Sequence, residues 1–515
     1  MRFFNSNKQL ITITTILSVL CLILGQRYYS TVNKLKIISS KNSEYLLKIK
    51  DINKLNLAPD SITNLAKFNE LNVFYEKNFG NNDNNFKVNP KFKAHGHDYS
   101  DVILNKLKSL LSIQRKIFFE DKYYETSLEN IIEDEVYDVK FGRISIPLPD
   151  KSFGINTQGT AYIDINKNNL ILTTADGDFY TSKVETQENN SIKLKNIESN
   201  ITTLIDYPEF YEDSMYGIKD ILLHEGNLYI SYINQIYKNN CWGIVVAKSK
   251  FNGNYLNFEV IYKPNSCVSI KGREGFWPHL TGGKLAKLNK NKIAVSVGAF
   301  AFGIGKSWPS DEVEFGKIME ININDYSKNV ISSGHRNPQG LFYSKKRNVL
   351  LSTEHGPKGG DELNFIKLDG TKQDFGWPSA SYGYSYWFKK GDEDIFLKSH
   401  KDNGFIEPKY FWTPSIGISA VEECSLSKEH SRLFIASLGN AKEEGTYENK
   451  FLKGKFVEES LSIIAENGND FPSINKKVIR IGGRIRDLIC DEDRKKVWYW
   501  DETNKGIGIL NLKKN

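Results

Sequence analysis

The sequence contains few cysteines, and their spacing excludes several kinds of redox and metal site. Among 515 residues there are five cysteines, none in a CxxC or CxxCH pattern. Zinc ribbons and thioredoxin-type sites need closely spaced cysteine pairs, and c-type haem attachment needs CxxCH, so all three are excluded. Apart from Cys21, the cysteines are Cys241, Cys267, Cys424 and Cys490. This even set permits two disulfides in an oxidising compartment, and four free thiols are the alternative.

The chain also lacks a basic block of the kind that binds nucleic acid. Its 69 basic and 62 acidic residues give a net charge of +7 and are spread along the whole sequence. No run of Lys and Arg interleaved with aromatic residues stands out. We therefore expect a solvated surface and no nucleic-acid partner. A hydrophobic content of 40% and an aromatic content of 12% are sufficient for a large core.

The apolar run near the amino terminus is short for a transmembrane helix. Residues 10–25 follow Arg2 and Lys8, which is the order found in export signals. A full span normally needs ~20 residues, and no small-x-small cleavage site follows the run. We predict that residues 1–26 form an uncleaved signal anchor that binds the membrane, with a cleaved signal peptide as the alternative. The remaining chain would then lie on the periplasmic side of the cytoplasmic membrane or be secreted.

Residues 27–150 predict a mostly helical extension. Apolar residues recur near a helical period between residues 102 and 119, with Lys and Arg between them. A second segment begins at Ser61 and ends at Gly80, a plausible helix start and stop.

Residues 151–515 predict an all-β fold. Short segments of alternating polar and apolar residues recur around polar turns such as Asp176–Gly177 and Glu225–Gly226, without a long helix between them. Repeated hairpins of this kind are typical of propeller blades, and a β-sandwich is the alternative. The range has room for six four-stranded blades of ~60 residues, which leaves length for functional loops.

Two motifs place polar side chains at the ends of neighbouring predicted strands. GHRNPQG covers residues 334–340, and EHGPKGGDE covers residues 354–362. One hairpin separates them, so the two loops can face each other on a rigid scaffold. Arg336 offers a planar fork of donors for a carboxylate or a quinone oxygen, and Asn337 and Gln339 offer both donors and acceptors.

The second motif and a later arginine pair suggest ligands for ions. The main-chain carbonyls of Gly356 and Pro357, together with the carboxylate of Asp361, suit a hard cation such as calcium. In GGRIRD, Arg484 and Arg486 are two residues apart, so on a strand their side chains face the same way. Two such arginines repel each other unless an anion lies between them. An ordinary salt bridge is the simpler explanation for this pair taken alone.

These motifs together resemble the soluble pyrroloquinoline-quinone (PQQ)-dependent aldose dehydrogenases, also called glucose/sorbosone dehydrogenases. GHRNPQG, EHGPKGGDELN, FGWPSASYG (375–383) and GGRIRD match that family in type and order. The resemblance covers roughly residues 155–515 and implies a six-bladed propeller with PQQ and calcium in the mouth of its channel. It also implies that a sugar or related hydroxyl compound gives hydride to PQQ and that an external acceptor takes the electrons.

The resemblance further assigns roles to individual residues. Residues of GHRNPQG contact the quinone, and Arg336 can stabilise the negative charge that develops on it. The EHGP carbonyls bind the calcium that polarises the quinone, and the GGRIRD arginines hold the PQQ carboxylates. The residues concerned are Arg336, Asn337, Gln339, Gly356, Pro357, Arg484 and Arg486.

The substrate side departs from the family pattern. The family's general base is a histidine in a stretch like Asp-His-x-x-Gly-Arg-Leu, and the nearest counterpart is FWPHLTGGKL. Pro278 stands where an acid is expected, and there is one extra residue before Lys284. We predict His279 as the base, although an alignment without a gap places Leu280 there. These changes leave a second function open, that of a catalytically inactive propeller serving as a binding or interaction module.

Two disulfides are predicted from the order of the strands. Cys241 and Cys267 lie at the outer ends of neighbouring predicted strands, so a hairpin would bring them together. Cys424 and Cys490 would link adjacent blades.

Overall fold

The computed structural model describes most of the chain after residue 158 and a few short segments before it. The described residues are 124–125, 131–134, 137–145, 159–184, 191–192, 194–205, 210, 214–237, 241–269, 278–300, 313–385, 396–413, 415–425, 431–441, 456–457, 461–465, 475–479, 483–503 and 505–512. The chain divides into two compact units, residues 1–120 with 206–212 and residues 121–205 with 213–515. All described residues except Phe210 belong to the second unit.

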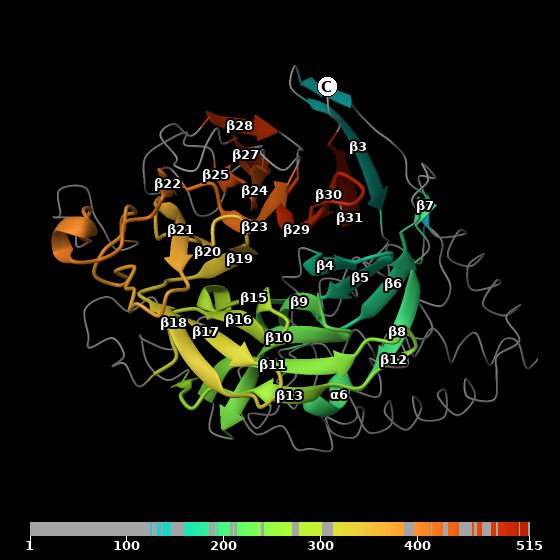
Figure 1. The fold of residues 1–515 in the computed structure, drawn as a ribbon, viewed down its shortest axis with the longest axis horizontal. Coiled ribbons are helices and arrows are strands. Elements are labelled where there is room, and N and C mark those ends of the chain that lie inside the picture. Colours follow the sequence, from blue (N-terminus) through green and yellow to red (C-terminus); the bar gives the residue numbers. More distant parts are fainter. Residues whose placement is uncertain are drawn as a thin grey trace, which may run out of the picture. The chain divides into compact units, whose positions relative to one another are not determined.

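The second unit is a β-propeller, in which antiparallel sheets are arranged around a common centre (Figure 1). Each innermost strand contacts the innermost strand of the next sheet, and the last of them returns to the first. The innermost strands, in order, are β4 (Ala161–Asn166), β9 (Ile218–His224), β15 (Gly282–Asn289), β19 (Pro338–Ser344), β23 (Ile418–Ser425) and β29 (Ile485–Asp491). We name each sheet after its innermost strand.

Five of these sheets are blades built from one continuous segment of chain, each with four antiparallel strands in sequence order. A short parallel strand, β12 (Tyr255–Leu256), joins the edge of the β4 blade, and β14 (Val268–Ser269) pairs with β11 in the β9 blade. The other strands of the five blades are β5 (Asn169–Thr174), β6 (Phe179–Lys183), β8 (Lys195–Ser199), β10 (Asn227–Tyr237), β11 (Cys241–Lys250), β13 (Glu259–Tyr262), β16 (Lys292–Val297), β17 (Lys317–Asn322), β18 (Lys328–Ser333), β20 (Val349–Glu354), β21 (Asp361–Lys367), β22 (Tyr410–Trp412), β24 (Ser431–Ser437), β27 (Leu461–Ala465) and β28 (Asn475–Ile479).

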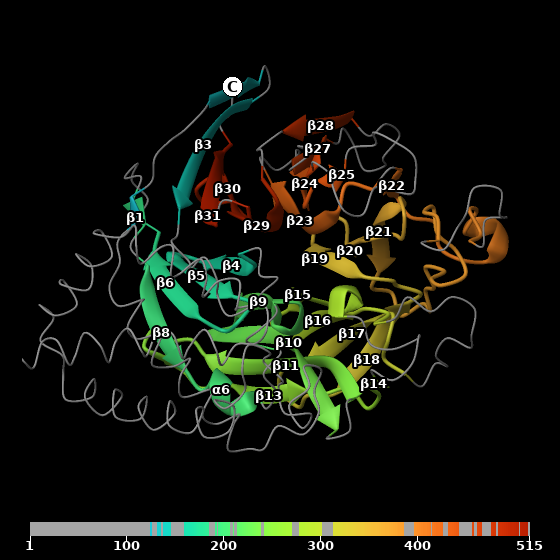
Figure 2. The same cartoon turned by 180° about the vertical axis from the view of Figure 1, so that it is seen from behind.

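The β29 sheet is assembled from two distant parts of the chain. Its first three strands are β29, β30 (Lys496–Asp501) and β31 (Gly506–Asn511), and β31 pairs antiparallel with β3 (Tyr137–Ser145). Figures 1 and 2 both show β3 beside β31, and β2 (Ile131–Asp134) continues the sheet outward. Pairing with β3 covers an edge of β31 that would otherwise present unpaired backbone groups.

This assembly corrects one sequence prediction. Residues 151–515 contain five complete blades rather than the predicted six, because the β29 sheet takes its outer strands from before residue 151. The described residues between 124 and 145 are strands, and the mostly helical character of the whole extension stays a prediction. The rest of the predicted helical extension lies outside the described residues.

Adjacent sheets pack through apolar side chains. Leu351 and Leu363 of the β19 blade are in one buried cluster with Leu433 and Ile435 of the β23 blade. A second cluster joins the β23 blade to the β29 sheet and includes Phe434. Full burial of one such side chain contributes roughly 1.5–3 kcal/mol, so these clusters fix how neighbouring blades sit against each other.

A disulfide reinforces the contact between two neighbouring sheets. Cys424 on β23 is bonded to Cys490 on β29, 66 residues further along, which confirms the prediction. Cys267 is also disulfide-bonded. The side chain of Cys241 lies outside the described residues, so its pairing with Cys267 stays a prediction, although β14 next to Cys267 does pair with β11 at Cys241.

The predicted membrane anchor falls outside the described part of the chain. Within the described residues, we find no helix that combines the length and apolar character needed to cross a membrane. Residues 10–25 are not among them.

Candidate active site

Strand register brings the two polar motifs together. On the β19 blade, Pro338 pairs with Glu354, and Glu354 pairs with Glu362. The residues just before β19 and the loop between β20 and β21 therefore lie at the same end of the blade. We call this the motif end, and the first two sequence motifs meet there as predicted.

Arg336 is held by the second motif. Its Nη1 donates to the main-chain oxygens of His355, at 2.9 Å, and Gly356, at 2.8 Å. Its backbone N–H donates to the Oε2 atom of Glu354, at 2.8 Å. The guanidinium lies 5.2 Å from the ring centre of Trp377. Both the backbone and the side chain of this buried arginine are therefore fixed before any ligand binds.

His335 and Glu354 form a buried pair next to Arg336. The Nδ1 atom of His335 lies 3.1 Å from the Oε1 atom of Glu354, and its Nε2 atom lies 2.8 Å from the Oγ atom of Ser332. Burial opposes the charge of Glu354, but His335 and neighbouring donors outweigh it and lower the pKa of this carboxyl. Gly334 has a φ of 76°, and a Cβ there would lie 2.0 Å from an Asp374 oxygen, so only glycine fits.

Asn337 and Gln339 join three sheets at the motif end. The Nδ2 atom of Asn337 donates to the main-chain oxygen of His279, at 2.8 Å. Its Oδ1 atom accepts from the backbone of Gly282, at 3.2 Å, and from the Nε2 atom of Gln339, at 3.0 Å. The Oε1 atom of Gln339 in turn accepts from Arg486 of the β29 sheet, at 3.3 Å. The two amides thus form a chain of hydrogen bonds from the β15 blade to the β29 sheet.

The arginine pair shares an anion that the protein itself supplies. Arg486 Nε donates to Oε1 of Glu502, at 2.5 Å, and Arg484 Nε donates to Oε2, at 3.3 Å. Thr160 also donates to Oε1, at 2.8 Å. Glu502 is 1% exposed. Burial raises its pKa, but the two arginines outweigh burial and lower it, so the carboxylate is charged. The salt bridge considered from the sequence is therefore present.

The structure gives Asp361 a role in holding the loop. Its Oδ1 atom accepts from the backbone of Gly356, at 3.1 Å, and its Oδ2 atom accepts from the backbones of Ile416 and Ile418, both at 3.0 Å. Both oxygens of this fully buried carboxylate are thus engaged. Within the described part of the chain, no three His, Cys, Asp or Glu side chains form a group that could hold a metal. The carbonyls of Gly356 and Pro357 stay the predicted calcium ligands.

His355 is a site residue that the sequence interpretation missed. Burial, together with the nearby charges of Arg336, Arg486 and Arg484, lowers its pKa to about 4, although Asp361 opposes this shift. The imidazole is therefore neutral near pH 7. Its position between Glu354 and Gly356 in the second motif was the available signal.

The main chain of His279 contacts the motif end, because its oxygen accepts a hydrogen bond from Asn337. Pro278–Leu280 form a short 3-10 helix, η4, directly before β15. The side chain of His279 is exposed, whereas Leu280 is buried and apolar. Of the two alignments considered, only the one with His279 therefore supplies a titratable group.

A model of one protein family matches most of the propeller. The glucose/sorbosone dehydrogenase model covers residues 167–510. The chain belongs to the glucose/sorbosone dehydrogenase family. Among solved structures, a glucose dehydrogenase superposes with a TM-score of 0.51 and 18% identity, covering 71% of this chain and 99% of that one. This second likeness supports the fold.

Curated relatives within this family match over shorter stretches. The aldose sugar dehydrogenase YliI of Escherichia coli is 27% identical over 162 residues, which is 32% of this chain and 38% of the relative. The quinoprotein glucose dehydrogenase B of Acinetobacter calcoaceticus is 34% identical over 105 residues, 17% of this chain and 21% of the relative. The chain thus matches well under half of the length of these relatives.

A buried charge cluster surrounds Lys284, which stands near the position of the arginine in the histidine motif of the family. Lys284 of β15 contacts Asp220 of β9, with Nζ to Oδ1 at 2.7 Å, and Asp487 of β29, with Nζ to Oδ1 at 2.9 Å. These residues are 64 and 203 positions away from Lys284. No local pattern in the sequence identified them as partners.

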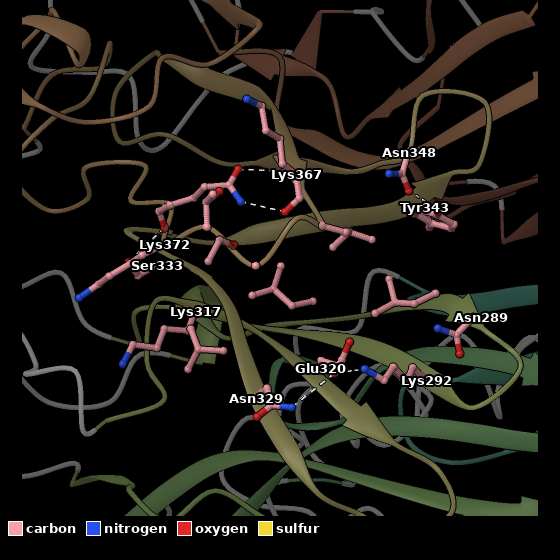
Figure 3. A pocket seen from close by; sticks show the side chains of 18 residues that line it. Asn289, Lys292, Lys317, Glu320, Asn329, Ser333, Tyr343, Asn348, Lys367 and Lys372 are labelled. Atoms are coloured by element: carbon pink, nitrogen blue, oxygen red, sulfur yellow. Dashed lines mark hydrogen bonds and ion pairs between the residues drawn. The ribbon is translucent and has the colours of Figure 1, made fainter.

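A separate cavity lies between the β15 and β19 blades. Its volume is about 710 Å³, and none of the family's motif residues lines it. Figure 3 shows Lys292 and Glu320 joined across its wall, while Lys317 and Lys372 lie on the opposite side of the view. A smaller cavity is lined by Arg336, Glu354 and His355 and belongs to the motif end.

Proposed function

We propose that this chain is an exported oxidoreductase that oxidises a sugar or a related hydroxyl compound by hydride transfer to PQQ, with calcium as a second cofactor. The observation that carries the proposal is the convergence of three guanidinium groups at the motif end. Arg336 comes from the β19 blade, and Arg484 and Arg486 come from the β29 sheet. All three are close enough to His355 to act on its pKa. Family membership and the quinoprotein relative support the same reading.

The residues at the motif end fit such a cofactor. PQQ is a planar tricarboxylate with two adjacent quinone oxygens, so it needs several cations and directed donors in one place. Guanidinium groups bind carboxylates in a planar, two-point manner, and Asn337 and Gln339 supply amide groups beside them. PQQ, when bound, supplies the hydride acceptor, while the protein binds and orients it.

Arg336 is the residue that we expect to affect the reaction most directly. Its guanidinium is already fixed by two main-chain oxygens, so it costs little reorganisation when negative charge develops nearby. The carbonyl oxygens of Gly356 and Pro357 would face calcium. His279, which is exposed, would remove the proton from the substrate hydroxyl. His279 must have a neutral imidazole to accept this proton.

A second function, a propeller that binds a partner without turnover, is favoured by the altered substrate side. Pro278 replaces the acid that the family pattern expects beside the base, and Lys284 replaces an arginine. Such changes would affect turnover before cofactor binding. The two functions can therefore be separated by measuring binding and reduction independently.

The test uses purified full-length protein with PQQ and calcium. We expect quinone absorbance to appear on the protein and to bleach when a suitable sugar, alcohol or aldehyde is added. His279→Gln should keep the absorbance and lose the bleaching. Binding without bleaching by any substrate would favour the interaction module, and absence of PQQ binding would contradict the proposed cofactor.

Arg336→Ala should fold normally and bind or reduce PQQ at least ~10²-fold less well, by analogy with other lost oxyanion donors. Arg347→Ala is the control, because the Arg347 guanidinium is also held by hydrogen bonds within the protein, with Nε donating to Oε1 of Glu423 at 3.1 Å, but lies at the opposite end of the β19–β20 hairpin. It should leave PQQ binding unchanged. An equal loss in both variants would mean that Arg336 acts only through stability.

A further inference from the structure

The cluster of Lys284, Asp220 and Asp487 has one more negative charge than positive charge. All three side chains are buried, with exposures of 6%, 4% and 5%. The single ammonium group of Lys284 contacts both carboxylates within 3 Å, at 2.7 and 2.9 Å. A buried ion is stable only when it is fully paired, so the excess negative charge makes this cluster a place where a proton can bind.

The carboxylates are also held by backbone groups, which fixes the geometry of the cluster. The second oxygen of Asp220 accepts from the backbone of Leu285, at 2.7 Å. The second oxygen of Asp487 accepts from the backbone of Ile163, at 3.0 Å. The cluster therefore ties β4, β9, β15 and β29 together, and it cannot relax by moving one carboxylate into water.

Other charged and titratable groups lie on the strands around the cluster. Negative groups are contributed by β4, β23 and the β30–β31 loop, and positive groups by β15 and β29. Burial and, to a smaller extent, the charge of Asp487 raise the pKa of Asp220 to about 7, although Lys284 opposes them. The groups that interact with the cluster directly are Tyr162, Asp164, Glu422 and Arg486. Lys287 and Glu502 interact with these neighbours.

The cluster is electrostatically connected to the arginine pair. Asp487 directly follows Arg486 in the chain. Lys284 lies 5.1 Å from the ring centre of Tyr162. Burial raises the pKa of the Tyr162 phenol, and the positive charges of Arg486 and Lys284 both oppose this rise. Burial opposes the charge of Arg486, but Glu502 and, to a smaller extent, Asp487 raise its pKa. Arg486 therefore interacts electrostatically with a carboxylate of the cluster, and a new anion at the arginine pair acts on the cluster as well.

We propose that binding of an anionic cofactor at Arg484 and Arg486 is coupled to uptake of one proton by the cluster of Lys284, Asp220 and Asp487. This inference rests on the proposed function and adds a linked equilibrium to it. The proton comes from the solvent and forms an O–H bond on Asp220, and no electrons move. The charge of the cluster changes from −1 to zero, which offsets part of the negative charge that the ligand brings.

The size of the uptake follows from the titration of Asp220. With a pKa of about 7 in the free protein, a rise of roughly one unit on ligand binding would give an uptake of about 0.4 proton at pH 7 and at pH 8. At pH 5.5 the group is already protonated, so the uptake falls below about 0.1. The signature is therefore an uptake that disappears as the pH is lowered.

The experiment is isothermal titration calorimetry of PQQ into calcium-loaded full-length protein, in buffers with different ionisation enthalpies. The dependence of the measured heat on the buffer gives the number of protons taken up. Asp220→Asn removes the titrating group, retains an acceptor for Leu285, and should reduce the uptake at pH 7 to near zero while PQQ still binds. Asp491→Asn is the matched control, since Asp491 is a buried aspartate at the far end of β29, paired with Arg494 at 2.8 Å.

The outcomes separate this inference from the proposed function. If PQQ does not bind, the proposed function fails first. If wild-type protein binds PQQ with no proton uptake at pH 7, the coupling is refuted. If Asp220→Asn takes up as many protons as wild type, the proton binds elsewhere, and the assignment to this cluster is refuted. Should Asp220→Asn not fold, the wild-type pH series alone decides, because uptake that persists at pH 5.5 contradicts the cluster.

Discussion

Replacing Glu502 with glutamine separates the two roles of the arginine pair. The substitution keeps the shape of the side chain and leaves an oxygen that can accept from Thr160, so it creates no cavity. It removes the negative charge that lies 2.5 Å from Arg486 Nε and 3.3 Å from Arg484 Nε. The two guanidinium groups are then left facing each other without a counter-charge.

The expected cost can be estimated from the geometry. One opposite pair at ~4 Å in an effective dielectric of ~20 is worth about 4 kcal/mol. Removing one partner of a buried pair costs about 3–5 kcal/mol in measured cases. The arginines retain other acceptors, Leu438 for Arg484 and Gln339 for Arg486. We therefore expect Glu502→Gln to lower the free energy of unfolding by about 3 kcal/mol.

Affinity for anions should change in the opposite direction. Without the negative charge of Glu502, the arginine pair has two positive charges available to bind the carboxylates of an added ligand. Glu502→Gln should bind PQQ, or citrate as a redox-inactive tricarboxylate, more tightly than wild type. Saturating ligand should also restore part of the lost stability, since ligand bound only to the folded state stabilises it by RT ln(1 + [L]/Kd).

Urea unfolding, followed by tryptophan fluorescence with and without citrate, measures both effects. The control is Glu320→Gln, which breaks the pair with Lys292 at 2.7 Å, where the two side chains are 19% and 39% exposed. Exposed pairs contribute about 0–1 kcal/mol, so this control should change stability little. Equal losses in the two variants, or weaker citrate binding by Glu502→Gln, would refute the assignment of Glu502 as the internal counter-ion.

The contacts between Glu502 and the two arginines also make the stability of the protein depend on pH. The arginines lower the pKa of Glu502 despite its burial, so its contribution to stability is present above the pKa of an unfolded glutamate, ~4.3, and is lost as the pH falls through the lower folded value. Acid unfolding of Glu502→Gln should lack this component. Replacing both Cys424 and Cys490 with serine should cost about 4 kcal/mol, because the bond closes a loop of 66 residues; unchanged urea unfolding would contradict this. Proteolytic cleavage before Gln26 after export should release folded, soluble protein into the exported compartment, whereas a natural amino terminus near residue 26 in cell fractions would indicate a cleaved signal.

Much of the propeller could be predicted from the sequence because its signals are local. Alternating residues around pairs such as Asp176–Gly177 identify hairpins without knowledge of the rest of the chain. The closure of the β29 sheet has no such signal, since β31 and β3 pair across the whole length of the propeller. A strand that completes a distant sheet resembles any other half-buried segment. Residues 137–145 were for this reason assigned to the helical extension.

The site shows the same division between local and distant information. Arg336, Asn337 and Gln339 share one short motif, and the structure brings them together with the second motif as predicted. Glu502 and Lys284 were missed because their partners are fixed only by the arrangement of the sheets. Asp361 stays a predicted calcium ligand, and its contacts had no local signal either, because the two backbone groups that donate to its Oδ2 atom come from the segment entering β23.

The charges at the motif end lead to a last prediction, which concerns calcium. Three guanidinium groups, those of Arg336, Arg484 and Arg486, are equal in number to the nearby carboxylates of Glu354, Asp361 and Glu502. Glu502 pairs directly with Arg484 and Arg486, while Glu354 and Asp361 accept from the backbone N–H groups of Arg336 and Gly356. His355 adds no charge, because its pKa is lowered to about 4. The site by itself therefore has almost no net positive charge with which to attract a tricarboxylate.

A divalent cation would supply that charge. We accordingly expect removal of calcium with a chelator to weaken PQQ binding by at least ~10-fold, and Glu502→Gln to recover part of this loss, because it adds one positive charge to the same site. Equilibrium dialysis of PQQ against both proteins, with and without chelator, tests the pair of expectations. Equal PQQ affinity in the presence and absence of calcium would mean that the guanidinium groups alone are sufficient, and the expected role of the cation would be refuted.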